Sequence, residues 1–126
     1  MEHIEIYGTS RIPTIQCNAQ SGTITIKGRS IQEDASNFYQ PIIEWLTEYS
    51  RNPQQKTVLN MELEYFNTSS SKSFLSMFKL LEQAATHGSE VSVNWYYEAE
   101  DYDMLESGEN YQSIVKLPFQ MIERPM

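Results

Sequence analysis

"KTVLNMELEYFNTSSSKSFLSMFKLLEQAATHGSEVSVNWYYE", residues 56–98, contains two strand-like runs on either side of a helix-like run. Within 56–66 and 90–98, apolar and polar side chains alternate, which predicts strands with one buried face. The apolar positions are Leu59, Met61, Leu63 and Tyr65 in the first run and Val91, Val93, Trp95 and Tyr97 in the second. A sheet built from such strands is covered on one side only.

Residues 70–87, between the two runs, predict a helix. Its apolar positions recur at helical spacing and are Phe74, Met77, Phe78, Leu81, Ala84 and Ala85. Gly88 suits the left-handed position that often follows a helix. Because such a helix links two strands of one sheet, we expect the strands to be parallel, with a right-handed crossover. This unit indicates the α/β class.

The residues at the N-terminus predict a hairpin. The runs 12–18 and 23–28 are rich in β-prone residues, and Gly22 can supply the positive φ of the turn between them. Residues 1–10 show no clear period, and we expect them to form a flexible arm or a short edge strand.

Residues 30–51 predict a further helix. Ser30 and Glu33 have the spacing of a capping box, and a single apolar stripe follows them. Pro41 interrupts this pattern because it has no backbone N–H to donate. We therefore expect a short first turn and then the main helix from about Phe38.

The C-terminal part predicts a weaker helix and a last strand. The helix begins near Asp101 and runs to Leu105 or beyond, and the strand covers 114–123, where Pro118 indicates an edge or a bulge. The full order is β-β-α-β-α-β-(α)-β. The 126 residues suit a single α/β domain, with a mixed β-sheet and its helices packed on one face.

The formal net charge of −8 bears on partners and location. An acidic domain repels phosphate backbones, so nucleic acid is not an expected partner. The sequence shows neither a signal peptide nor a spanning helix, so we expect a cytoplasmic protein without membrane insertion. Within 98–109, six acidic residues occur without a Lys or Arg, which indicates either a solvated face or a docking surface for a basic partner.

Motifs for catalysis, metals or cofactors are absent from the sequence. It contains no P-loop, CxxC or HExxH pattern, and we expect no catalytic residues, no metal and no cofactor. The lone Cys17 fits a strand core, and His87 fits the end of a helix. Glu62 and Glu64 share one face of a strand, so a small enzyme that uses this pair stays an alternative.

The junction between strand and helix holds more hydroxyl groups than helix capping requires. One N-cap residue is enough, yet Asn67 and Thr68 are followed by three serines: Ser69, Ser70 and Ser71. A phosphate here would meet the positive end of the helix dipole. Lys72, four residues after Thr68, could pair with it. We therefore interpret the junction as a modification and partner-binding site made of Asn67, Thr68, Ser69 and Lys72.

Three stretches resemble the SiaC family of regulatory phosphoproteins, whose fold is similar to the STAS domain of anti-sigma-factor antagonists. They are "FYQPIIEWLTEY" (38–49), "LNMELEYFNTSSSK" (59–72) and "VNWYYEAEDYDMLESGENY" (93–111), and the resemblance covers nearly the whole chain. The Asp-Ser pattern of the better-known STAS antagonists is absent, so transfer from that wider group is weak.

The resemblance implies a partner switch that controls cyclic di-GMP and biofilm formation. A Ser/Thr kinase with a histidine-kinase-like ATPase fold would phosphorylate the protein, and a PP2C-like phosphatase would reverse this step. The unphosphorylated form would bind and activate a diguanylate cyclase. The family's phosphoacceptor falls on Thr68, with Ser69, Ser70 and Ser71 as alternatives. The remaining alternative is an unregulated acidic adaptor that docks a basic partner.

Overall fold

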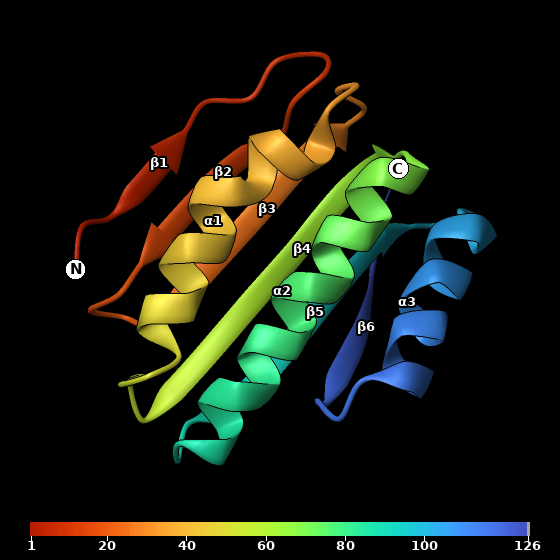
Figure 1. The fold of residues 1–126 in the computed structure, drawn as a ribbon. Coiled ribbons are helices and arrows are strands. Elements are labelled where there is room, and N and C mark those ends of the chain that lie inside the picture. The colour runs from red at the N-terminus through yellow and green to blue at the C-terminus, as the bar shows by residue number, and fades with distance from the viewer. Residues whose placement is uncertain (126) are drawn as a thin grey trace.

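The computed structural model describes residues 1–125, in which six strands pair in the order that they have in the chain (Figure 1). The strands are β1 (Ile4–Ile6), β2 (Thr14–Asn18), β3 (Thr23–Ser30), β4 (Lys56–Phe66), β5 (Glu90–Glu98) and β6 (Phe119–Arg124). β1, β2 and β3 form antiparallel pairs, whereas β3, β4, β5 and β6 are parallel. The predicted mixed sheet is confirmed, and residues 1–10 contribute its short edge strand.

The helices all cover the same face of this sheet (Figure 1). They are α1 (Ala35–Tyr49), α2 (Thr68–Thr86) and α3 (Tyr102–Ile114). The core lies between α1, α2 and the sheet, and its largest fully buried side chains include Tyr39, Phe74, Phe78 and Trp95. The opposite face of the sheet carries no helix, so the one-sided coverage that the alternating strands predict is confirmed.

The region 56–98 folds as its two periodicities predict. β4 and β5 are parallel neighbours, and α2 connects them. α2 begins at Thr68, two residues earlier than predicted, because the side chain of Asn67 caps it. Ala84 continues the buried stripe, whereas Ala85 is exposed, since it points about 100° further around the helix. Gly88 has φ 94° after the helix, as expected for a C-terminal glycine.

A bulge near the end of β4 reverses the predicted direction of its last side chains. Leu63 pairs with Gly28 and Tyr65 pairs with Arg29, so Glu64 has no opposite residue in β3. As a result Tyr65, predicted on the buried face, is 56% exposed. Phe66 takes its place and packs against Phe74 and Trp95. The extra residue therefore turns β4 toward α2 with an aromatic anchor in the core.

The predicted start of α1 at Ser30 is wrong. Ser30 is the last residue of β3 and is fully buried, and the helix begins at Ala35 after its N-cap residue Asp34. The helix then continues through Pro41 without a separate first turn. Pro41 is exposed, so water can hydrogen-bond the backbone carbonyl that the missing N–H leaves unpaired.

The third helix is longer, and the last strand shorter, than predicted. α3 runs to Ile114, so the strand starts at Phe119 rather than at 114. The helix packs closely on β5 at Gly108, where an added Cβ would lie 2.5 Å from Trp95 Cδ1. The indole N–H of Trp95 donates to the Met104 carbonyl at 2.9 Å. β6 lies at the edge of the sheet, as Pro118 predicts.

Candidate functional site

The start of α2 is fixed to the rest of the domain by its capping residue. The Asn67 side-chain oxygen accepts from the Ser70 N–H at 2.9 Å, and its amide nitrogen donates to the Gln32 carbonyl at 3.0 Å. The Asn67 backbone N–H donates to the Ser30 carbonyl at 3.0 Å. This corner therefore joins the carboxyl ends of β3 and β4, an edge where open α/β sheets place their ligands.

The four hydroxyls after Asn67 lie in different surroundings. Thr68 is exposed, and Ser69 is half-buried. Ser70 is 0% exposed, and its hydroxyl lies 2.7 Å from Ser30 Oγ. Ser71 is half-buried, and its hydroxyl lies 2.7 Å from the phenol oxygen of Tyr111. Access from solvent thus favours Thr68, and burial argues against Ser70.

The buried hydroxyls form a network that sequence reasoning missed. Ser30 Oγ contacts both Ser70 Oγ and the Tyr39 hydroxyl, the latter at 2.6 Å. Ser70 Oγ also donates to the Ser30 carbonyl at 3.1 Å. Burial raises the pKa of Tyr39 to about 12, although the hydrogen bond from Ser30 opposes this rise. No local signal marks these residues, because Ser30 and Ser70 are 40 positions apart.

The electrostatics at the tip of α2 favour an anion. The first N–H groups of a helix have no partner within it, and they form the positive end of its dipole. The first turn of α2 contains no acidic residue. Lys72 is exposed and stands one turn after Thr68. A negatively charged group on Thr68 would therefore be accommodated by the domain itself.

Part of the acidic segment 98–109 has a structural role. The Asp101 side chain caps α3 by accepting from the Met104 N–H at 3.1 Å. Asp103 stands in the first turn of α3, where the helix dipole favours a negative charge. The segment is not one continuous acidic patch. The acidic residues of α3 that remain exposed beyond its first turn are Glu106 and Glu109.

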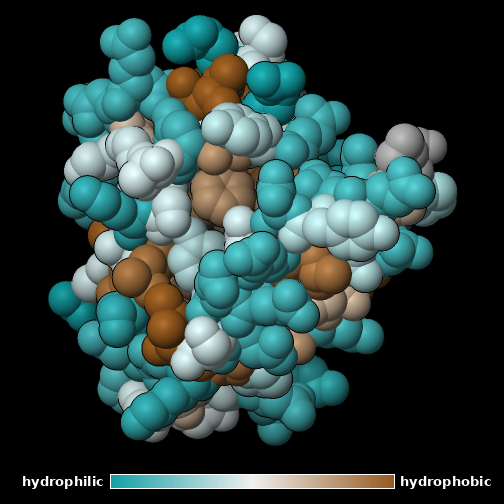
Figure 2. All heavy atoms as spheres, turned by 90° about the vertical axis from the view of Figure 1, so that its right-hand side faces the viewer, coloured by the Kyte–Doolittle hydropathy of each residue, from teal (hydrophilic) through white to brown (hydrophobic). Residues whose placement is uncertain are grey.

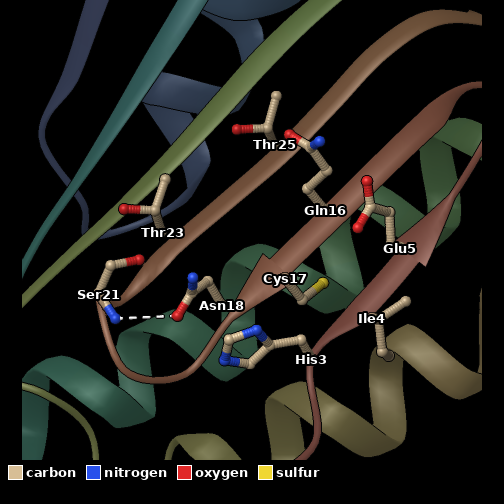
Figure 3. Close-up of a pocket in the computed structure, with 9 residues that line it drawn as sticks. All are labelled: His3, Ile4, Glu5, Gln16, Cys17, Asn18, Ser21, Thr23 and Thr25. Atoms are coloured by element: carbon tan, nitrogen blue, oxygen red, sulfur yellow. Dashed lines mark hydrogen bonds between the residues drawn. The ribbon is translucent and has the colours of Figure 1, made fainter.

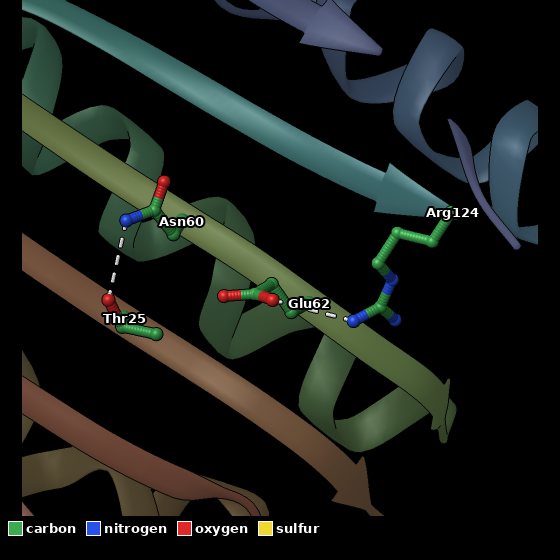
Figure 4. A network of polar contacts seen from close by, with 4 residues as sticks. All are labelled: Thr25, Asn60, Glu62 and Arg124. Atoms are coloured by element: carbon green, nitrogen blue, oxygen red, sulfur yellow. Dashed lines mark hydrogen bonds and ion pairs between the residues drawn. The ribbon is translucent and has the colours of Figure 1, made fainter. Parts of the chain in front are cut away.

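The two carboxylates of the enzyme alternative are not arranged alike. Glu62 Oε1 accepts from Arg124 Nη1 at 3.4 Å, and both side chains are largely buried. Arg124 also lies over the Tyr96 ring, 5.7 Å from its centroid. Glu64 is exposed at the bulge. Figure 4 shows Glu62 beside the Thr25–Asn60 hydrogen bond on the bare face of the sheet, where the ion pair joins β4 to β6.

A polar hollow of about 380 Å³ lies beside β1, β2 and β3 (Figure 3). Cys17 lines it, yet burial raises the pKa of this thiol to about 12, so it stays protonated near neutral pH. Within residues 1–125, no group of three or more His, Cys, Asp or Glu residues is placed to hold a metal ion. None of the described helices is long and apolar enough to cross a membrane.

The raised pKa of Cys17 predicts a loss of stability in alkali. The unfolded thiol ionises near its ordinary pKa of 9.0, whereas the folded thiol does so at about 12. The folded state therefore binds more protons in this range, and stability is expected to fall as pH rises from 9 to 12. Urea denaturation at a series of pH values checks this. The decline should become shallower in Cys17→Ala, and an unchanged slope would contradict the assignment.

Comparisons with known proteins agree with this fold. The sequence model of the SiaC family of regulatory phosphoproteins matches residues 6–124. An uncharacterized protein of Pseudomonas aeruginosa strain UCBPP-PA14 is 30% identical over 119 residues, or 94% of each protein. The structure of SiaC of Pseudomonas aeruginosa is 28% identical, with a TM-score of 0.88 over 98% of this chain and 100% of that chain. The crystal structure of the diguanylate cyclase SiaD in complex with its activator SiaC, from the same species, contains a chain that is 29% identical. Its TM-score is 0.89, over 96% of this chain and 99% of that chain.

Proposed function

Since this chain belongs to the SiaC family of regulatory phosphoproteins, we propose that it is a phosphorylation-controlled binding protein without catalysis of its own. Its unphosphorylated form binds and activates a diguanylate cyclase, and phosphorylation of Thr68 releases that cyclase. The activator role is supported by the similarity to SiaC, which is found in complex with the cyclase SiaD. A Ser/Thr kinase with a histidine-kinase-like ATPase fold and a PP2C-like phosphatase set the phosphorylation state.

The observation that carries the choice of Thr68 is its exposure at the first position of α2. Ser70 is fully buried, and the hydroxyl of Ser71 is engaged by Tyr111. A kinase can therefore reach Thr68 without breaking either contact. Ser69, which is half-buried, is the next most accessible hydroxyl of this turn.

The chemistry of a phosphate explains how one modification can spare the fold and still break a complex. It adds a charge of about −1.5 to −2 at pH 7. Within the domain this charge meets free N–H groups and the helix dipole, an interaction of about 0.3–1 kcal/mol. Inside an apolar contact with a partner, the same charge would have to lose its water without a dedicated counter-charge. The modification therefore destabilises the complex far more than the domain.

Replacing Thr68 tests this proposal. Thr68→Ala is expected to bind the cyclase like the wild type but to take up no phosphate from the kinase, as read by intact mass and peptide mapping. Thr68→Asp is expected to bind at least about tenfold more weakly in calorimetry, a loss of about 1.4 kcal/mol. Ser69→Ala is the matched control and should be phosphorylated normally. Wild-type affinity in Thr68→Asp would refute the release mechanism, and phosphate on Ser69 would move the acceptor.

A further inference from the structure

A hollow of about 280 Å³ separates α2 from α3 next to the Thr68 corner. Phe66, Leu75, Tyr111 and Ile114 give it a mainly apolar lining. Ile114 is 60% exposed, and Leu75 is half-buried. The side of the molecule that α3 and β6 form is otherwise mostly hydrophilic, with hydrophobic atoms showing in separate patches (Figure 2). The hollow is therefore a place where apolar surface stays in water unless a partner covers it.

The shape of the hollow favours a side chain of a protein over a free small molecule. Its volume lies just below the range of about 300–1,000 Å³ that is usual for small-ligand sites. Its walls are two helices, so the exposed apolar residues follow helical spacing: Ser107, Asn110, Tyr111 and Ile114 on α3, with Ser71, Lys72 and Leu75 on α2. An amphipathic helix that lays its apolar side chains into a groove of this kind is a common mode of recognition.

The two walls carry opposite charges. On α3, Asp103 and Glu106 lie one turn before Ser107 and Asn110, and both acids are exposed. On α2, Lys72 lines the hollow, and Lys79 stands one turn after Leu75. The ion pairs within residues 1–125 are Lys56–Glu90 and Arg124–Glu62, so the ammonium of Lys72 is available to a partner.

Lys72 and the tip of α2 form a positive spot on a protein of net charge −8. A phosphate on Thr68, one helical turn away, would pair with Lys72 and reverse the sign of this spot. A partner that presents a carboxylate here would be attracted before phosphorylation and repelled after it. A partner that presents only basic groups would instead be attracted more strongly after it, which does not fit release.

We propose that this hollow is the docking groove for an amphipathic helix of the cyclase, a step that rests on the proposed function above. The helix places an apolar side chain against Leu75 and Ile114. It sets a carboxylate beside Lys72, and basic residues face the acids of α3. Phosphorylation acts by capturing Lys72 and repelling that carboxylate.

Titration of the purified full-length chain with the purified cyclase tests the groove. Ile114→Ser is expected to raise Kd at least tenfold, and Lys72→Gln about fivefold. Tyr7→Ser, which is also an exposed apolar position, and Lys27→Gln are matched controls outside the groove and should keep the wild-type Kd. Thermal unfolding of each variant confirms that the domain is folded. Affinity is also expected to fall as salt rises, because salt screens the paired charges.

A double-mutant cycle tests the capture of Lys72. Thr68→Asp is expected to weaken binding less in the Lys72→Gln background than in the wild type, because the lysine that it would capture is already absent. Wild-type Kd in both Ile114→Ser and Lys72→Gln, with release by Thr68→Asp intact, overturns the groove and leaves the proposed function standing. If Thr68→Asp has no effect in any background, the proposed function fails instead. If Ile114→Ser changes only self-association by light scattering, the groove takes a second copy, and the cyclase helix is refuted.

Discussion

Replacing Trp95 with alanine is expected to lower the free energy of unfolding by about 3–5 kcal/mol, the usual cost of deleting a buried aromatic side chain. Trp95 is 0% exposed and packs against Phe66 and Tyr111. Its N–H donates to the Met104 carbonyl, which would be left without this donor. Because whole domains have only about 5–15 kcal/mol of stability, Trp95→Ala should unfold at a far lower urea concentration, as read by circular dichroism.

The loss should be greatest for α3, which rests on Trp95 through Gly108. Hydrogen exchange in residues 102–114 is therefore expected to accelerate more than exchange in α1. Tyr102→Ala is the matched control, since that side chain is 71% exposed and its loss should change stability by less than about 0.5 kcal/mol. A Trp95→Ala variant that loses less than about 1 kcal/mol would show that α3 does not depend on this contact.

Two aspartates placed two residues apart should have opposite consequences. Thr68→Asp puts a carboxylate at the exposed tip of α2, where the dipole contributes about 0.3–1 kcal/mol in its favour. Ser70→Asp puts the same group in a fully buried position, next to the Ser30 carbonyl that now accepts from the Ser70 hydroxyl. An uncompensated buried charge of this kind costs about 3–5 kcal/mol. Guanidinium denaturation of both variants measures the difference.

Ser70→Ala separates charge from the loss of hydrogen bonds. It removes the contact with Ser30 without adding a charge, and we expect a cost of about 1–3 kcal/mol. If Ser70→Asp were as stable as Thr68→Asp, the corner would be open enough for a phosphate on either residue. The exposure argument for Thr68 would then lose its basis.

The elements that sequence reasoning predicted correctly are those with a strong local period. β4, α2 and β5 each repeat their apolar residues often enough to determine both type and face. The cap at Asn67 and the glycine after α2 are also local signals. α3 was predicted only weakly, because its buried residues are limited to Met104, Gly108 and Tyr111. A glycine facing an indole ring is not a helical signal in the sequence.

The features that could not be predicted depend on residues far apart in the chain. Nothing in 56–66 shows that Glu64 is a bulge, because the bulge is defined by the pairing with Gly28 and Arg29. For the same reason the exposure of Tyr65 was missed. The serines of the candidate site look equivalent in sequence, and only the contacts made by Ser30 and Tyr111 distinguish them.

The strand order has a consequence for how the chain folds. Every strand pairs only with its predecessor and successor, so the sheet can extend by one strand at a time from the N-terminus as synthesis proceeds. No segment has to pass between strands that are already paired. Ser30 and Tyr39 emerge before Ser70, whereas Tyr111 emerges long after it. The nascent chain thus completes the buried side of the regulatory corner first, and its outer brace is the last part to be made.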